Sequence, residues 1–165
     1  MKNNGHVTMK ERDFPVTQRL ITTTDTQGAI TYCNDGFVNI SGFERDQLLG
    51  SAHNIVRHPD MPEAVFAHMW SHLKAGKAWM GIVKNRCKNG DFYWVNAYVT
   101  PISENGRVTG YESVRVKPEA EQVSRASALY ARMRSGAATS SAGASSRFLR
   151  ALAMPLFASL LVLAA

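Results

Sequence analysis

Residues 79–102 read WMGIVKNRCKNGDFYWVNAYVTPI and carry the strongest signal for the fold. The turn residues 88–91 (KNGD) separate two runs rich in β-branched and aromatic side chains, and an Asn-Gly pair in that position is a strong hairpin signal. We therefore expect a strand over residues 79–87, a tight turn, and a long aromatic strand over residues 92–102.

The sequence on either side of this hairpin supplies three further strands. Residues 104–106 (ENG) form the next turn signal, and residues 108–116 form the last predicted strand. Upstream, the turn at residues 25–28 (DTQG) joins two short β-branched runs, so we expect strands at 19–24 and 29–33.

Helical patterns fill the interval between the second and third predicted strands. One short helical stretch begins at Asn34, and another covers residues 44–49. The longer helix, expected over residues 63–74, carries one apolar stripe at i, i+3, i+4 and i+7 spacing. That stripe consists of Phe66, Met69, Trp70 and Leu73.

This order of elements predicts an α+β fold, in which a five-stranded antiparallel sheet has its helices gathered on one face. The space between sheet and helices is a natural pocket for a planar ligand. We place the globular domain at residues 19–117, after a mobile N-terminal arm at 1–18. A linker helix (118–134) and a flexible Gly/Ala/Ser-rich linker (135–147) follow it.

An apolar run ends the sequence. No charged residue occurs from Ala151 to Ala165, although a full membrane span needs roughly 20 apolar residues. We interpret residues 148–165 as the start of a transmembrane helix; a buried or interfacial helix is the alternative. The net charge of +6 comes largely from arginines of the last third, such as Arg115 and Arg147, and basic flanks place the preceding domain in the cytoplasm.

Composition and motifs exclude several classes of function. The two cysteines, Cys33 and Cys87, lie in predicted strands and form no zinc or disulfide pattern, which favours a reducing compartment. No GxSxG, Walker loop or pair of catalytic carboxylates is present, so we expect no enzyme. Positive charge gathers beside the apolar segment rather than among exposed aromatics, which argues against nucleic-acid binding.

Residues 53–62 (HNIVRHPDMP) concentrate polar chemistry in one turn. Pro59 and Pro62 restrict the backbone. Arg57 offers a rigid fork of donors suited to phosphate or carboxylate, and Asp60 could cap the helix that follows. A capped turn with solvated charges is the alternative interpretation.

Taken together, the strand-turn-strand start, the helix opening at Asn34 and the KNGD turn before an aromatic strand resemble the PAS sensor fold over residues 19–117. Within that family, residues 54–62, 79–86 and 93–94 are similar to the PAS domains of bacterial aerotaxis receptors.

The resemblance implies a cofactor and a setting for the domain. Members of the family bind FAD non-covalently and signal its redox state. They continue through an inner-membrane anchor into HAMP and chemoreceptor segments, which act on the chemotaxis kinase machinery. The resemblance also implies that the full-length protein is a homodimer. We therefore expect a cytoplasmic FAD-binding redox or oxygen sensor for aerotaxis.

Two residues of the predicted strand 79–87 suit a flavin. Trp79, Gly81, Val83 and Asn85 alternate onto one face. Trp79 could stack on the flavin ring, and the Asn85 amide could pair with its pyrimidine edge because it both donates and accepts. The alternative is that Trp79 belongs to the core and Asn85 ends a strand.

Further candidates rest on the resemblance. Asn34 could face the ligand or only cap a helix, Arg57 could meet the pyrophosphate, and His53 could contact a flavin edge or the ribose. His58 and Asp60 are further candidates, but they could instead shape the turn. Phe66 and Tyr93 could be walls of the cavity or ordinary core residues.

Two other PAS functions remain open. A haem-binding sensor would use His53 or His58 as ligand, whereas His68 and His72 fall on the helix face away from the apolar stripe and are expected at the surface. A PAS interaction module without ligand is the second alternative. We expect no light-driven cysteine adduct, because neither cysteine lies in a helical position suited to it.

Overall fold

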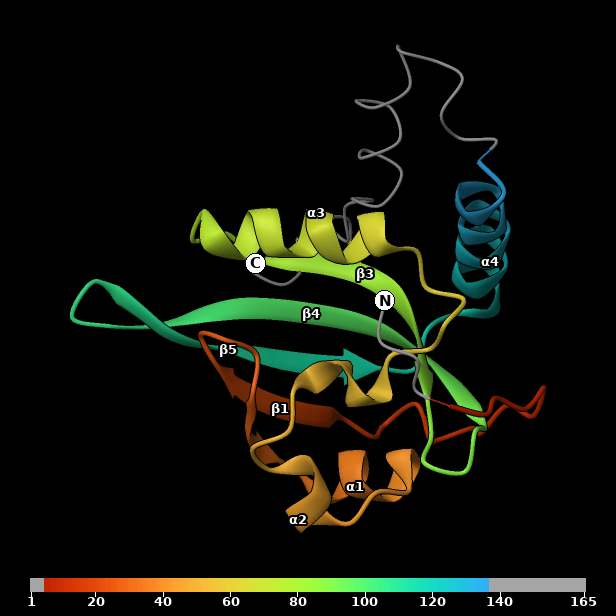
Figure 1. The fold of residues 1–165 in the computed structure, drawn as a ribbon, viewed down its shortest axis with the longest axis horizontal. Coiled ribbons are helices and arrows are strands. Elements are labelled where there is room, and N and C mark those ends of the chain that lie inside the picture. The colour runs from red at the N-terminus through yellow and green to blue at the C-terminus, as the bar shows by residue number, and fades with distance from the viewer. Residues whose placement is uncertain (1–4, 137–165) are drawn as a thin grey trace, which may run out of the picture.

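The expected hairpin forms one edge of a five-stranded antiparallel sheet (Figure 1). In the computed structural model, which describes residues 5–136, β3 (Trp79–Arg86) pairs with β4 (Phe92–Glu104). The amide of Cys87 donates to the carbonyl of Asp91 across the turn, and Gly90 takes a φ of 94°, which a residue with a side chain rarely adopts.

The remaining strands complete the sheet in the order β2-β1-β5-β4-β3. β1 (Leu20–Asp25) pairs with β2 (Ile30–Cys33) and with β5 (Arg107–Val116), which in turn pairs with β4. All five strands agree with the predicted ones. The last strand therefore occupies the centre of the sheet and contacts both hairpins.

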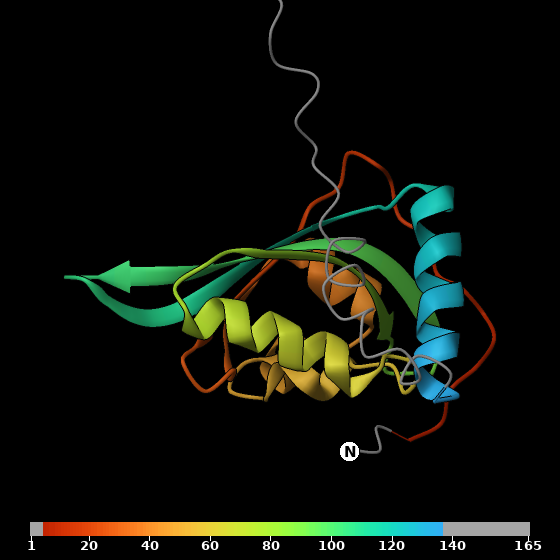
Figure 2. The ribbon, with the colours of Figure 1, turned by 90° about the horizontal axis from the view of Figure 1, so that it is seen from above.

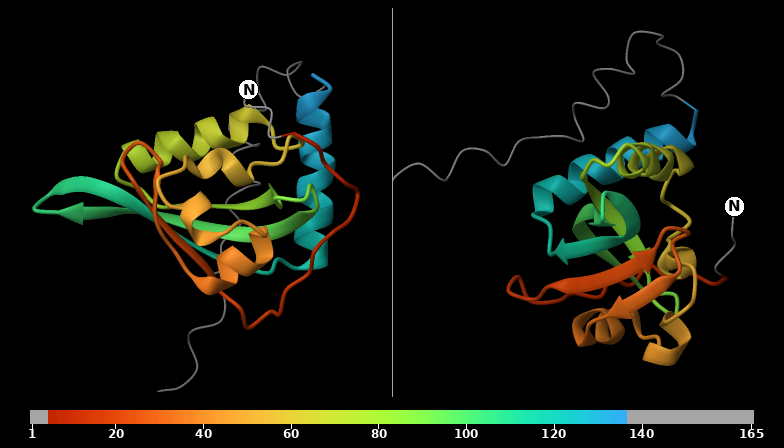
Figure 3. Two further views of the ribbon diagram at one scale, coloured as in Figure 1. Left: turned by 60° about the horizontal axis from the view of Figure 1, so that its bottom comes forward. Right: turned by 90° about the vertical axis from the view of Figure 1, so that its left-hand side faces the viewer.

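Three helices and one 3-10 turn lie on one face of the sheet, as expected (Figures 1 and 2). They are α1 (Asp35–Ser41), α2 (Arg45–Leu48), the 3-10 helix η1 (His53–Val56) and α3 (Glu63–Lys74). α1 and α2 lie beside β1 and β2, whereas α3 lies beside β3 (Figure 3). The bounds of α3 are those that its apolar stripe predicted.

Local side-chain chemistry explains where α1 and α3 begin. The side chain of Asn34 accepts a hydrogen bond from the amide of Phe37, which satisfies a free donor at the start of α1. Asp60 does not cap α3, in contrast to our prediction. Pro62 occupies the position before α3, two residues after Asp60, and the Asp60 carboxylate pairs instead with Nζ of Lys84 at 2.7 Å.

The linker helix is α4 (Ala120–Arg134), which lies outside the layer of α1 to α3 and packs against the edge strand β3 (Figure 2). Tyr130 is buried, and its hydroxyl donates to the carbonyl of Ile82 at 2.6 Å. At its far end, the guanidinium of Arg134 donates to the carbonyl of Asp60 at 2.5 Å.

Residues 5–18, expected to belong to a mobile arm, are hydrogen-bonded to the sheet. Phe92 donates its amide to Lys10 and accepts from Arg12, so this segment runs beside the start of β4. The hydroxyl of Thr8 donates to Asp91 at 2.6 Å, and Phe14 is buried. The segment has no helix, but it is part of the packed domain.

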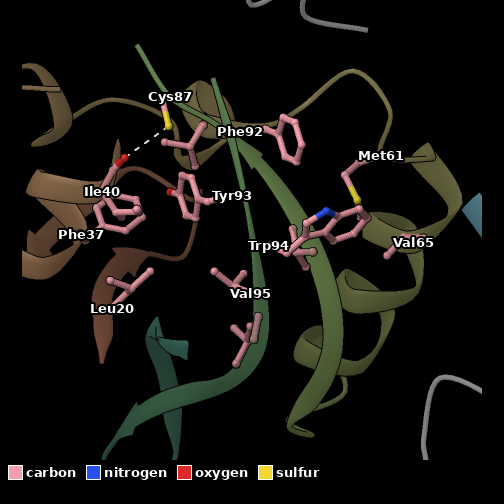
Figure 4. Close-up of a cluster of buried hydrophobic side chains, with 14 of the residues drawn as sticks. Leu20, Phe37, Ile40, Met61, Val65, Cys87, Phe92, Tyr93, Trp94 and Val95 are labelled. Carbon is pink, nitrogen blue, oxygen red and sulfur yellow. Dashed lines mark hydrogen bonds between the residues drawn. The ribbon is translucent and has the colours of Figure 1, made fainter. Parts of the chain in front are cut away.

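The alternation of β4 separates two groups of side chains (Figure 4). Tyr93 points toward Phe37 and Ile40, whereas Trp94 lies on the other side of the strand with Met61.

Within residues 5–136, no helix is long and apolar enough to cross a bilayer. The predicted linker at 135–147, beyond its first two residues, and the predicted membrane segment at 148–165 lie outside the described residues.

Candidate functional site

A cavity of about 390 Å³ lies between the sheet and the helices. Ligand pockets in proteins typically measure about 300–1,000 Å³, so this volume suits a small organic molecule. The whole predicted stripe of α3 lines it. The cavity is bounded by Thr22, Thr24, Gln27, Gly28, Ala52, His53, Asn54, Val56, Arg57, Phe66, Met69, Trp70, Leu73, Trp79, Val83, Asn85, Ala97, Val99, Tyr111, Glu112, Ser113 and Arg115.

The polar turn that follows α2 wraps around this cavity. The amide of His53 donates to the carbonyl of Gly28 at 2.9 Å, and the backbone of Arg57 forms an isolated bridge with Asn85 of β3. These backbone contacts connect η1 to both halves of the sheet. The side chains of His53 and Arg57 are therefore positioned by main-chain bonds at the rim of one hollow.

Arg57 is also placed by an aromatic neighbour. Its guanidinium carbon lies 4.4 Å from the centre of the Phe66 ring, and its Nη2 donates to the carbonyl of Met61 at 3.2 Å. A cation over a ring face is attracted by the ring's electron density. Phe66 thus serves as a wall residue that also orients Arg57.

One buried polar atom on the cavity wall, Oγ of Ser113, lacks a partner among residues 5–136. The side chain of Asn85, also on this wall, lies against the phenol of its cross-strand neighbour Tyr93. Buried polar groups are nearly always hydrogen-bonded, and leaving one unsatisfied is costly. A ligand with an acceptor atom at its edge would satisfy Ser113, so this atom indicates a binding site rather than ordinary core.

A buried cation lies on the same wall. Arg115 of β5 is 5% exposed, and both of its terminal nitrogens donate to the hydroxyl of Thr22 at 3.0 Å. Within the described part of the chain, no carboxylate forms an ion pair with it. Burial lowers the pKa of Arg115 to about 10, so it keeps its charge at neutral pH and favours negative charge on a neighbouring ligand.

Arg115 also determines the state of His53. Its Nη2 donates to Nε2 of His53 at 2.7 Å, so Nε2 is an acceptor and the ring proton resides on Nδ1. Loss of water around the ring, and then the Arg115 charge, lower the pKa of His53 to about 3. His53 is therefore neutral at physiological pH.

Five of the nine predicted site residues line the cavity: His53, Arg57, Phe66, Trp79 and Asn85. The alternation predicted for β3 is confirmed, because Trp79, Val83 and Asn85 share the cavity face. The other four candidates lie elsewhere, each for a physical reason given below. His68 and His72 do not line the cavity either, although both are half-buried rather than exposed.

Asn34 is not a cavity residue, because its side chain is fully used within the fold. Its Oδ1 accepts from the amides of Phe37 and Ile21, each at 3.0 Å, and its Nδ2 donates to the carbonyl of Arg19 at 2.8 Å. Asn34 therefore joins the start of α1 to β1 and supports the ligand site only from outside.

His58 and Asp60 point to the opposite side of the turn from the cavity. Asp60 pairs with Lys84, and the amide of Asp60 donates to Nδ1 of His58. Burial and then the Lys84 charge lower the pKa of His58 to about 4. Burial opposes ionisation of Asp60, but the hydrogen bond and charge of Lys84 lower its pKa. These residues shape the turn.

Tyr93 lies on the cavity face of the sheet but behind the lining residues. It pairs across the strands with Asn85 and is fully buried beside Phe37 and Ile40 (Figure 4). Burial raises the pKa of its phenol. Its position makes it core.

The sequence interpretation missed the contribution of β5 and β1. Arg115 was counted with the basic residues near the apolar segment, and Ser113 and Thr22 were not considered. The period-2 alternation of β5 could have identified them, because Tyr111, Ser113 and Arg115 share one face of that strand and all line the cavity. Recognising this would have required knowing that β5 pairs with β1.

Comparison with known proteins identifies the family of the fold and several similar sequences. The family model described as "PAS fold" matches residues 30–115. The chain is 44% identical over 136 residues to the aerotaxis receptor of Escherichia coli strain K12, covering 82% of this chain and 27% of that protein. It is 29% identical to a nitrogen fixation regulatory protein of Klebsiella pneumoniae, covering 50% of this chain and 17% of that one.

The structural comparison agrees. The light-state structure of the blue-light photoreceptor Aureochrome1 LOV matches with a TM-score of 0.60 and 19% identity, over 72% of this chain and 93% of that one. This likeness establishes the fold alone. The chain spans about a quarter or less of the length of the two sequence relatives described above. The family model and the observed sheet together show that the chain belongs to the PAS family.

Proposed function

We propose that this chain is the FAD-binding redox sensor of a membrane-anchored aerotaxis receptor. The observation that carries the proposal is the wall of the cavity, which an aromatic ring (Trp79) shares with an amide (Asn85), an unpartnered hydroxyl (Ser113) and a buried cation (Arg115). An isoalloxazine ring requires an apolar slot with a few directed hydrogen bonds, and this wall offers both.

The residues have separable roles in holding the cofactor. Trp79 supplies a stacking surface, and the Asn85 amide pairs with the pyrimidine edge. Arg57, at the rim, meets the pyrophosphate through its fork of donors. When bound, the flavin supplies reversible electron transfer; the protein positions it and tunes its potential.

The electrostatics of the site favour the electron-rich form of a bound ring. Arg115 keeps a fixed positive charge in a region shielded from water, where its effect is stronger than at the surface. His53 stays neutral and accepts from Arg115, so it holds the guanidinium in place without adding charge. The wall is therefore built to respond to a change of charge on the ligand.

The edge strand β3 is the proposed route from the cavity to α4. Asn85 faces the cavity, its neighbour Lys84 pairs with Asp60 on the other side, and the carbonyl of Ile82 accepts from Tyr130 of α4. A redox state of the ligand can shift α4 only if it interacts differently with two conformations of this strand.

The remaining parts of the proposal rest on the relative at 44% identity, which is named an aerotaxis receptor and of which this chain covers 27%. We propose that residues 135–147 form a flexible linker and residues 148–165 begin the membrane anchor, with the PAS domain in the cytoplasm. HAMP and signalling segments would follow and act on the chemotaxis kinase machinery, in a homodimer.

An absorption spectrum of the purified 165-residue chain tests the cofactor assignment. We expect two flavin bands that bleach with dithionite under anaerobic conditions and return in air, and released cofactor that co-migrates with FAD rather than FMN. A Soret band would instead assign haem. A protein that stays colourless after reconstitution with FAD would overturn the proposal and leave an interaction module.

A further inference from the structure

The Trp79 indole lies against the backbone of its own strand. β3 has a glycine two residues further on, and a Cβ atom at Gly81 would overlap Cη2 and Cζ2 of the indole. Trp79 and Gly81 share the cavity face of β3, where side chains normally stand away from the sheet. Gly81 therefore provides the space in which the six-membered ring of Trp79 lies down over the strand.

The polar edge of the same indole is turned toward α3. Nε1 of Trp79 donates to Nδ1 of His68 at 3.0 Å. His68 is half-buried and does not line the cavity, so the N–H group of Trp79 is satisfied from outside the site. The cavity consequently meets an indole whose single donor is already engaged and whose ring atoms remain for stacking.

His68 is suited to accept this bond because Nδ1 must be unprotonated. Its surroundings favour the neutral ring: burial, and then the neighbouring His72, lower the pKa of His68. The centres of the two imidazole rings are 4.3 Å apart, and the carbonyl of His68 lies 3.0 Å from Nδ1 of His72. The pair is thus fixed on α3, directly behind Trp79.

We propose that His68 is a positioning residue for the ring-binding site: with Gly81 beneath the indole, it holds Trp79 in the orientation that a planar cofactor ring needs. The proposal rests on the proposed flavin function and adds a residue outside the cavity to that site. Without an acceptor at this place, the indole N–H would be a buried unsatisfied donor. The indole would then turn to find a partner, because such a donor is costly to leave unpaired.

The test compares two substitutions of His68. His68→Leu removes the acceptor, whereas His68→Asn keeps one, because Oδ1 of Asn lies as many bonds from the backbone as Nδ1 of His. Lys74→Leu is the control, since Lys74 is an exposed residue of the same helix and no hydrogen bond joins it to Trp79 or His68. Each 165-residue chain is freed of cofactor and titrated with FAD, and binding is followed by flavin fluorescence and by the visible absorption spectrum.

We expect His68→Leu to weaken FAD binding by about tenfold, the effect of one unsatisfied donor, and to shift the visible bands of bound FAD. His68→Asn and Lys74→Leu should keep both properties close to those of the unaltered chain. Equal FAD affinity and equal spectra for His68→Leu and the unaltered chain would overturn the inference, as would His68→Asn binding as weakly as His68→Leu.

A double-mutant cycle separates positioning from general stability. Trp79→Phe keeps an aromatic ring but has no N–H, so adding His68→Leu to it should leave FAD affinity unchanged. A further loss of about tenfold in that background would refute an action through Trp79, even if His68→Leu alone folds poorly. Failure of the unaltered chain to bind FAD would refute the flavin function itself, which is a distinguishable result.

Discussion

Arg115 is the single residue that most changes the chemistry of the cavity. It brings a buried charge into a hollow with many apolar side chains, and within residues 5–136 no carboxylate forms an ion pair with it. Arg115 of β5 is hydrogen-bonded to Thr22 of β1 and to His53 of η1, so its orientation depends on three elements. Such a group acts on a ligand through its charge.

Replacing Arg115 with Gln should lower the midpoint potential of the bound flavin. Reduction adds negative charge to the ring, and the buried cation stabilises that charge. We expect a shift of some tens of millivolts, since a tenfold change in a one-electron equilibrium corresponds to about 59 mV. Spectroelectrochemical titration measures it. Arg125→Gln, at an exposed position on α4, is the control, and an equal shift in both variants would contradict the assigned role.

Asn34→Ala should destabilise the fold without changing the composition of the cavity wall. The variant loses a helix cap, one bond to Ile21 of β1 and one to Arg19 just before that strand, and a cap alone is worth about 1 kcal/mol. We expect a loss of about 1–3 kcal/mol in the free energy of unfolding by urea. The exposed Asn39→Ala in the same helix should have little effect. Unchanged stability of Asn34→Ala would show that solvent replaces these bonds.

At the scale of elements, β3 is the strand with two distinct surfaces. Its odd-numbered residues Trp79, Val83 and Asn85 face the cavity, whereas Ile82 and Lys84 meet α4 and the polar turn. The period-2 alternation predicted the first surface from the sequence. The second could not be predicted, because the partner helix lies more than 30 residues further along the chain.

Tyr130→Phe should loosen α4 from β3. The substitution removes the 2.6 Å hydrogen bond to the carbonyl of Ile82 and keeps the buried ring, so we expect a cost of about 0.5–1.5 kcal/mol. Faster hydrogen exchange should be confined to α4 and the middle of β3. Tyr32→Phe, at a half-exposed position on β2, is the matched control. Uniformly faster exchange throughout the domain would argue against a local docking role.

The whole molecule should lose stability as the pH falls from 7 to 5. His53 and His58 have pKa values of about 3 and about 4 in the fold, below the ordinary value of 6.5. In this range the unfolded chain therefore binds protons that the folded chain does not, and acidification favours unfolding. The loss is at most about 2 kcal/mol for each histidine.

Urea unfolding at several pH values checks this dependence. The carboxylates with lowered pKa values, such as Asp60, contribute mainly below pH 4 and leave the upper range to the histidines. His58→Gln removes one titrating group, so the slope of stability against pH should become shallower, while His53 and His68, whose pKa values are also lowered, maintain the rest. Constant stability of the unaltered chain between pH 7 and 5 would contradict the neutral state assigned to both rings.

Local signals in the sequence are sufficient to predict the elements, the fold and the residues of β3 and α3 that line the cavity. These signals are a KNGD turn, a period of two along a strand, and an apolar stripe along a helix. The contacts of Arg115 with His53 and of His68 with the Trp79 indole become visible only in the folded chain. The tertiary structure also removed Asn34, His58 and Asp60 from the cavity wall. These contacts join residues far apart in the chain, and which side chains meet depends on strand order and on competition for hydrogen-bond partners.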